Sequence, residues 1–133
     1  DMTRTVAVGT ASEQFRNIYA IVHEAQVAAL DAVAPGVNCV ELDGIARDII
    51  GQAGHSEHFG HGLGHGVGLR IHELPTISYR SKNEVLAENM VITIEPGIYI
   101  PGWGGVRIED TAVVTESDRT VLNNATKELM IID

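Results

Sequence analysis

Histidine and glycine alternate in one short stretch of the chain. Five of the six histidines fall within 18 residues, namely His55, His58, His61, His65 and His72. From residue 60 to residue 68 every second residue is glycine, which removes one face of side chains and lets a ligand or another backbone come close. We therefore expect a specific partner for at least one of His61 and His65. His55 and His58 follow a helix end in a polar stretch and are assigned to the surface.

Two glutamates occur where predicted strands should bury them. Glu95 follows the run VITI, and Glu109 follows VRI. A buried, unpaired carboxylate is costly, so each glutamate needs a cation or strong hydrogen-bond donors. A salt bridge to Arg107 or Arg70 would satisfy either one, whereas the pair of glutamates together with the histidine run favours a metal.

Imidazole and carboxylate ligands without thiolates suit manganese, cobalt, iron or zinc. A carboxylate can bridge two cations, and a two-metal site generates hydroxide near neutral pH. The residue types and their spacing therefore predict a divalent-metal hydrolase site.

Composition limits the alternatives. The 133 residues fit one domain, and the net charge of −9 disfavours nucleic acid and anionic membranes as partners. The acidic surplus is either a solvated surface or a group of carboxylates gathered round a cation. A single cysteine, Cys39, excludes an internal disulfide and suits a reducing, cytoplasmic compartment. Because the sequence starts with aspartate, we expect a fragment of a larger polypeptide.

Two helices and several strands must position these residues. A strand is expected over residues 3–8, and a helix over about 12–33 with Ser12 as its cap. Its apolar stripe is Phe15, Ile18, Val22, Ala25 and Ala29. A second helix starts at a capping box formed by Asn38 and Glu41 and ends at Gly51 and Gly54. Its predicted buried face is Leu42, Ile45, Ala46 and Ile49.

The second half of the chain is predicted to be mostly strands. They cover residues 90–95, 98–100, 105–108, 111–115 and 129–132, with bends at 96–97 and 102–104 and a hairpin tip at 116–119. The expected fold is α+β, with both helices on one face of an antiparallel sheet.

Five ordered segments resemble one known family. They are residues 1–5 (DMTRT), 61–69 (HGLGHGVGL), 71–75 (IHELP), 93–99 (TIEPGIY) and 106–110 (VRIED). The chain is similar over its whole length to the pita-bread metallopeptidases, which include methionine aminopeptidase, Xaa-Pro aminopeptidase and prolidase. The resemblance implies that residues 1–133 form the C-terminal half of the catalytic domain, with a curved antiparallel sheet. The upstream half, including an aspartate in an Asp-x-Gly motif, would lie outside the chain.

The same resemblance implies a site with two divalent metal ions, manganese or cobalt being expected and zinc or iron being possible. Asp1 and Glu109 match the family's bridging carboxylates, and His65 and Glu95 match ligands of one metal. A metal-bridging hydroxide would attack the scissile carbonyl, and Glu95 would carry the proton to the leaving nitrogen.

Three further residues match family positions near the substrate. His72 resembles a histidine that contacts the substrate carbonyl and the tetrahedral intermediate, and His61 resembles one that lines the pocket. Arg107 resembles a residue that orients the bridging carboxylates.

Within the family, Arg107, the run at 95–99 and the paired His61 and His65 resemble the proline-specific branch. The expected activity of the parent protein is hydrolysis of an Xaa-Pro bond in a peptide or dipeptide, and the fragment alone is expected to be inactive. A homodimer of the parent is one option for its assembly. The alternatives are a methionine aminopeptidase-like exopeptidase and a non-catalytic peptide-binding module. The retained ligands argue against a metal-free, creatinase-like amidinohydrolase.

Overall fold

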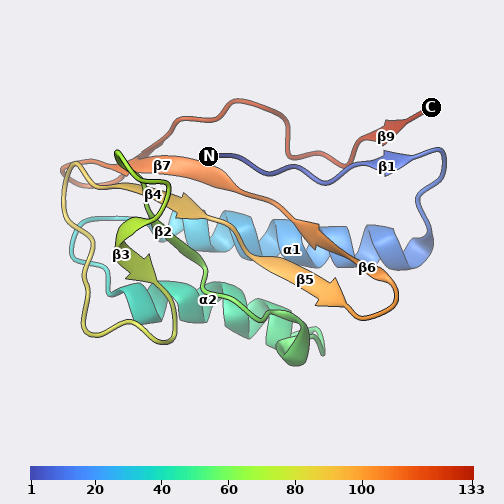
Figure 1. Ribbon diagram of the computed structural model, residues 1–133, viewed down its shortest axis with the longest axis horizontal. Coiled ribbons are helices and arrows are strands. Elements are labelled where there is room, and N and C mark those ends of the chain that lie inside the picture. The colour runs from blue at the N-terminus through green and yellow to red at the C-terminus, as the bar shows by residue number, and fades with distance from the viewer.

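The computed structural model describes residues 1–133 and places two helices beside a set of short strands (Figure 1). Helix α1 (Glu13–Asp31) begins at Ser12, whose side chain accepts a hydrogen bond from the Phe15 backbone N–H. It buries Ile18, Val22, Ala25 and Ala29, with Phe15 half-buried at its start. The predicted helix and its apolar stripe are confirmed.

Helix α2 (Cys39–Gln52) begins at Asn38, whose side chain accepts from the N–H groups of Val40 and Glu41. The return hydrogen bond predicted from the Glu41 carboxylate does not form. The predicted buried face is wrong in part, because Ile45 and Ile49 are only half-buried. The fully buried hydrophobic positions are Cys39, Leu42, Ala46 and Ile50, which follow one another at steps of three and four.

Nine strands and one short 3-10 helix complete the chain. The 3-10 helix η1 is Ser56–His58, and the strands are β1 (Ala7–Val8), β2 (Gly64–Gly66), β3 (Glu73–Ile77), β4 (Val91–Ile94), β5 (Gly97–Ile100), β6 (Gly104–Arg107), β7 (Asp110–Val114), β8 (Arg119–Val121) and β9 (Ile131–Ile132). Five strands form an antiparallel sheet in the order β3-β2-β4-β7-β8. β5 and β6 form a hairpin, and β1 pairs in parallel with β9.

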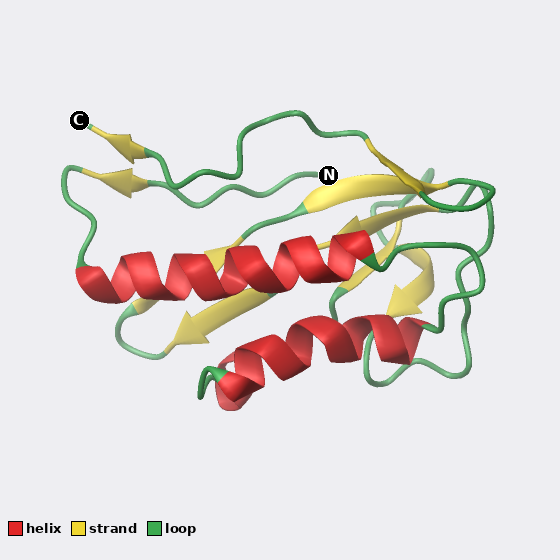
Figure 2. Cartoon of the chain, turned by 180° about the vertical axis from the view of Figure 1, so that it is seen from behind, coloured by secondary structure: helices red, strands yellow, loops and turns green.

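Both helices lie on one side of the strands, as Figure 2 shows from behind. The α+β prediction is therefore confirmed. The hairpin predicted around residues 116–119 joins β7 and β8. The strand predicted over residues 3–8 is mostly wrong, because only Ala7 and Val8 pair as a strand and Thr3 makes an isolated bridge to Glu109. Neither helix is long and apolar enough to cross a membrane.

The glycine-rich segment makes the close approach that its pattern predicts. A Cβ atom on Gly64 would collide with the backbone carbonyl of Thr93 in β4, and one on Gly66 would collide with that of Leu74 in β3. Glycine at these two positions therefore allows β2 to lie between its neighbours, and it fixes where the His65 side chain emerges.

Candidate metal centre

The two strand-end glutamates face each other at a break in the sheet. The pairing of β4 with β7 ends at Ile94 opposite Asp110, and the β5–β6 pairing starts at Gly97 opposite Arg107. One step beyond the first pair places Glu95 opposite Glu109, since both ladders keep the same register. Like charges directly opposite each other destabilise a sheet.

The break admits two further segments of the chain. The Glu95 backbone N–H donates to the Leu63 carbonyl at 2.8 Å, and the Glu109 N–H donates to the Thr3 carbonyl at 3.0 Å. His65 lies two residues after Leu63, and Asp1 lies two residues before Thr3. The two glutamates bond to these segments rather than to each other. As a result His65 and a third carboxylate, that of Asp1, lie at the same place.

Asp1, His65 and Glu109 each offer one ligand atom within 4.8 Å of the others. The Nε2 atom of His65 is 3.2 Å from Oε1 of Glu95 and 4.0 Å from Oδ2 of Asp1. The structure therefore brings together all four residues that the sequence analysis matched to metal ligands.

The hydrogen bonds of His65 suit a metal ligand. Its Nδ1 atom lies 2.9 Å from the Gly66 carbonyl, which can only accept, so Nδ1 carries the proton. In the neutral ring the lone pair of Nε2 then faces the carboxylate of Glu95. A carbonyl that accepts from the other ring nitrogen is the usual support of a metal-binding histidine. Two acceptors at 3.2 Å call for a proton or a cation between them.

The local charge balance points the same way. Burial, and then the neighbouring charge of Glu95, raise the pKa of Glu109, against the lowering effect of a hydrogen bond from Thr3. No lysine or arginine forms a salt bridge with Asp1, Glu95 or Glu109. The salt bridges to Arg107 or Arg70 that the sequence left open do not form. Three carboxylates and one imidazole nitrogen without a basic partner fit a divalent cation.

A pocket of about 320 Å³ opens beside these donors. Its lining residues are His61, Gly62, Gly64, His65, His72, Thr76, Ser78, Glu95 and Arg107. Five of the predicted site residues therefore share one cavity, and its volume lies at the lower end of the roughly 300–1,000 Å³ found for small-ligand sites. The exposed ring of His72 packs against that of His65, with 4.2 Å between centroids.

Tyr99 joins two of the predicted site residues and was assigned no role from the sequence. Its hydroxyl lies 2.9 Å from Nε2 of His61 and accepts from Arg107 Nη1 at 3.2 Å. His61 donates through Nδ1 to the Gly62 carbonyl at 2.7 Å, so Nε2 accepts from the tyrosine hydroxyl. The hydrogen bond to Tyr99 is also the main reason why the pKa of Arg107 is raised. Arg107 therefore stays charged.

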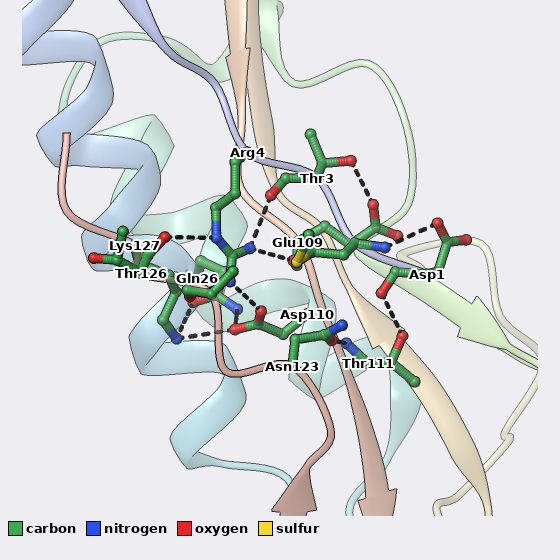
Figure 3. Close-up of polar contacts among 12 residues, drawn as sticks. Asp1, Thr3, Arg4, Gln26, Glu109, Asp110, Thr111, Asn123, Thr126 and Lys127 are labelled. Carbon is green, nitrogen blue, oxygen red and sulfur yellow. Dashed lines mark hydrogen bonds and ion pairs between the residues drawn. The ribbon is translucent and has the colours of Figure 1, made fainter. Parts of the chain in front are cut away.

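A layer of hydroxyl groups holds the carboxylate side of the site (Figure 3). Thr3 donates through its hydroxyl to Glu109 Oε2 at 2.5 Å and accepts from Arg107 Nε at 3.1 Å. The Thr111 hydroxyl donates to the Asp1 carbonyl at 2.7 Å. The sequence offered no local signal for these contacts, since they join residues more than 100 positions apart.

His55 and His58, which the sequence assigned to the surface, are partly exposed there. Both are half-buried at η1, and their Nδ1 atoms are 3.1 Å apart. They take no part in the pocket.

The fold is that of a metallopeptidase. A family model described as Metallopeptidase family M24 matches residues 1–116, and the chain belongs to this family. The chain is 55% identical over 130 residues to an Xaa-Pro dipeptidase of Pyrococcus furiosus. The aligned residues cover 98% of this chain and 37% of that protein.

Solved structures agree with this family. An Xaa-Pro dipeptidase from Bacillus anthracis matches with a TM-score of 0.96 at 48% identity, over 99% of this chain and 37% of its own. An X-Pro aminopeptidase from Thermotoga maritima MSB8 matches with a TM-score of 0.94 at 42% identity, again over 99% of this chain and 37% of its own. These likenesses confirm the C-terminal half of the pita-bread fold. The chain spans little more than a third of the length of these relatives.

Proposed function

We propose that this chain is the C-terminal part of the catalytic domain of a metal-dependent peptidase that hydrolyses Xaa-Pro bonds. The observation that carries the proposal is the placing of Glu95 opposite Glu109, with His65 and Asp1 brought to the same break in the sheet. Family membership implies divalent metal ions, and the relatives' names supply the substrate class.

In this proposal Asp1, His65, Glu95 and Glu109 would hold two divalent cations, with Asp1 and Glu109 in the positions of the family's bridging carboxylates. The fifth ligand is the upstream aspartate of the family's Asp-x-Gly motif, supplied by the rest of a longer protein. The cations, when bound, polarise the scissile carbonyl and provide hydroxide near neutral pH. Four of five ligands leave the site incomplete, so the 133-residue chain alone is inactive.

Glu95 is the proposed general acid and base. Its Oε1 atom accepts from the Thr93 hydroxyl at 3.1 Å, which orients the carboxylate, and its Oε2 atom makes no hydrogen bond within the chain. Glu95 lines the pocket, so a carboxylate oxygen without a hydrogen bond can take a proton there and return it to the leaving nitrogen. The cleavage needs this step, because the proline nitrogen must gain a proton to leave as an amine when the C–N bond breaks.

The other pocket residues bind and orient the substrate. His72 has an exposed ring at the pocket wall, where it can donate a hydrogen bond to the substrate carbonyl. Arg107, Tyr99 and His61 form one hydrogen-bonded series with a fixed direction, which holds a charged guanidinium at the pocket and keeps His61 in one tautomer. We also propose a reducing, cytoplasmic location, because the single thiol, Cys39, is unpaired and buried.

The test uses the full-length protein with manganese or cobalt and four matched peptides. Leu-Pro tests the dipeptidase and Leu-Pro-Gly tests the Xaa-Pro aminopeptidase, while Leu-Ala lacks the tertiary amide and Met-Ala-Ser tests a methionine aminopeptidase. We expect cleavage of Leu-Pro, no cleavage after metal removal by a chelator, and recovery when the metal is restored.

Preferred cleavage of Met-Ala-Ser would favour the methionine aminopeptidase instead. Binding of the peptides without hydrolysis, with metal present, would favour a peptide-binding module and contradict the proposal.

A further inference from the structure

A buried ion pair lies directly behind the proposed bridging carboxylates. Arg4 Nη2 is 2.7 Å from Oδ1 of Asp110, and the two side chains are 8% and 1% exposed. Lys127 lies 3.0 Å from the other oxygen of Asp110, and Gln26 donates to that oxygen at 3.2 Å. Figure 3 shows this group between the strands and α1.

Arg4 uses all five N–H donors of its guanidinium group. Nη1 donates to the carbonyls of Thr3 at 2.9 Å and Glu109 at 2.6 Å. Nη2 donates to Asp110 and to the Ala125 carbonyl at 2.9 Å, and Nε donates to the Thr126 carbonyl at 2.8 Å. One side chain thus ties together the start of the chain, the start of β7 and the segment before β9.

Strand geometry connects these hydrogen bonds of Arg4 to the metal centre. Thr3 and Glu109 pair through their backbones, with N–H to carbonyl distances of 3.0 and 3.4 Å. Successive side chains on extended chain point to opposite faces. Thr3 and Glu109 therefore face the metal centre, while Arg4 and Asp110, the next residues along, point to the α1 side (Figure 3).

Stability alone is a poor reason for such a cluster. Apolar residues of similar volume often replace a buried ion pair without loss of stability. What an apolar pair cannot do is hold the carbonyls of Thr3 and Glu109 at one guanidinium. Asp1 lies two residues from Thr3 on the same segment. The distance between Asp1 and Glu109 therefore depends on the two hydrogen bonds from Arg4 to these carbonyls.

We propose that Arg4 and Asp110 are positioning residues that fix the separation of Asp1 and Glu109. This inference rests on the proposed function, in which those two carboxylates would hold the metals. Neither Arg4 nor Asp110 needs to touch metal or substrate for this role. Their removal should act through the affinity for metal, because supporting partners of metal ligands typically contribute about 10–100-fold to it.

The experiment compares Asp110→Asn and Arg4→Lys with the wild type in the full-length protein. Isothermal titration with Mn²⁺ measures affinity on metal-free protein, and circular dichroism confirms that each variant is folded at the titration temperature. Asp110→Asn keeps the shape and removes the charge. Arg4→Lys keeps the charge and loses the five-donor geometry. Ile50→Ala in α2 is the control, since this side chain is buried away from the pocket and its truncation weakens only packing.

We expect both site variants to weaken Mn²⁺ binding about 10–100-fold, and the control to bind like the wild type at a comparable loss of thermal stability. Variants that lose thermal stability but bind Mn²⁺ with wild-type affinity would overturn the positioning role while leaving the proposed function intact. A wild-type protein that neither binds Mn²⁺ nor cleaves Leu-Pro would remove the proposed function, and this inference with it.

Discussion

Glu109→Gln should make the metal-free protein more stable and the metal-loaded protein relatively less stable. Glu109 is buried, and its ligand atom lies within 4.8 Å of that of Asp1. Two unit charges at that distance repel by about 3.5 kcal/mol at an effective dielectric constant of about 20, and by about 1 kcal/mol in water. The Asp1 side chain is 29% exposed, which screens the pair. A gain of about 1–2 kcal/mol is therefore expected.

Glutamine keeps the shape of the side chain, and its carbonyl oxygen can still accept the hydrogen bond from the Thr3 hydroxyl. The change thus removes charge with little loss of packing. With Mn²⁺ present the wild type should be the more stable of the two proteins. A ligand present at about 100 times its dissociation constant stabilises the folded state by about 2.7 kcal/mol, and the variant lacks one of the carboxylates that would hold the metal.

The assay is thermal unfolding of the full-length protein, once with a chelator and once with Mn²⁺. Glu24→Gln is the matched control, since this exposed glutamate of α1 makes no side-chain hydrogen bond or salt bridge, and its effect should stay within about 0.5 kcal/mol. We expect Glu109→Gln to unfold a few degrees above the wild type in chelator and below it in Mn²⁺. If the variant unfolds below the wild type in chelator as well, the electrostatic reasoning is wrong.

Three further predictions concern positioning, burial and the pocket. Gly64→Ala should destabilise the fold by about 1–3 kcal/mol, or more if the backbone carbonyl of Thr93 cannot shift, as measured by urea unfolding; Gly60→Ala, where a Cβ meets nothing within 4 Å, should be close to neutral. Burial raises the pKa of the Cys39 thiol to about 11 from 9.0, so at pH 8 its thiolate fraction falls about 100-fold, and iodoacetamide should label the folded protein slowly and the urea-unfolded protein fast. Tyr99→Phe removes a hydroxyl with two partners and should lower kcat/KM about 10-fold with unchanged Mn²⁺ affinity; equal weakening of metal binding would contradict its placing in the substrate pocket.

The sequence predicted those parts of the fold that depend on local patterns. Ser12 and Asn38 correctly predicted where the two helices begin, because N-capping depends only on neighbouring residues. The cost of burying a lone carboxylate was enough to single out Glu95 and Glu109. β2 and β3 were not predicted, since glycine and proline have low strand propensity and these strands form through contacts with distant backbone.

The part of the site that sequence reasoning missed is held by long-range contacts. Arg4 and Asp110 are 106 residues apart, and neither has a neighbour that reveals its partner. The same holds for Thr3, which reaches both Glu109 and Arg107. Such pairs become visible only when the folded sheet brings the segments together.

Anomalous X-ray scattering from crystals of the full-length protein grown with Mn²⁺ would test the central claim most directly. The account predicts two manganese peaks at the break between the two strand ladders, in contact with Nε2 of His65 and with the carboxylates of Asp1, Glu95 and Glu109. Manganese bound elsewhere, or no peak at this break under conditions in which the protein cleaves Leu-Pro, would contradict it.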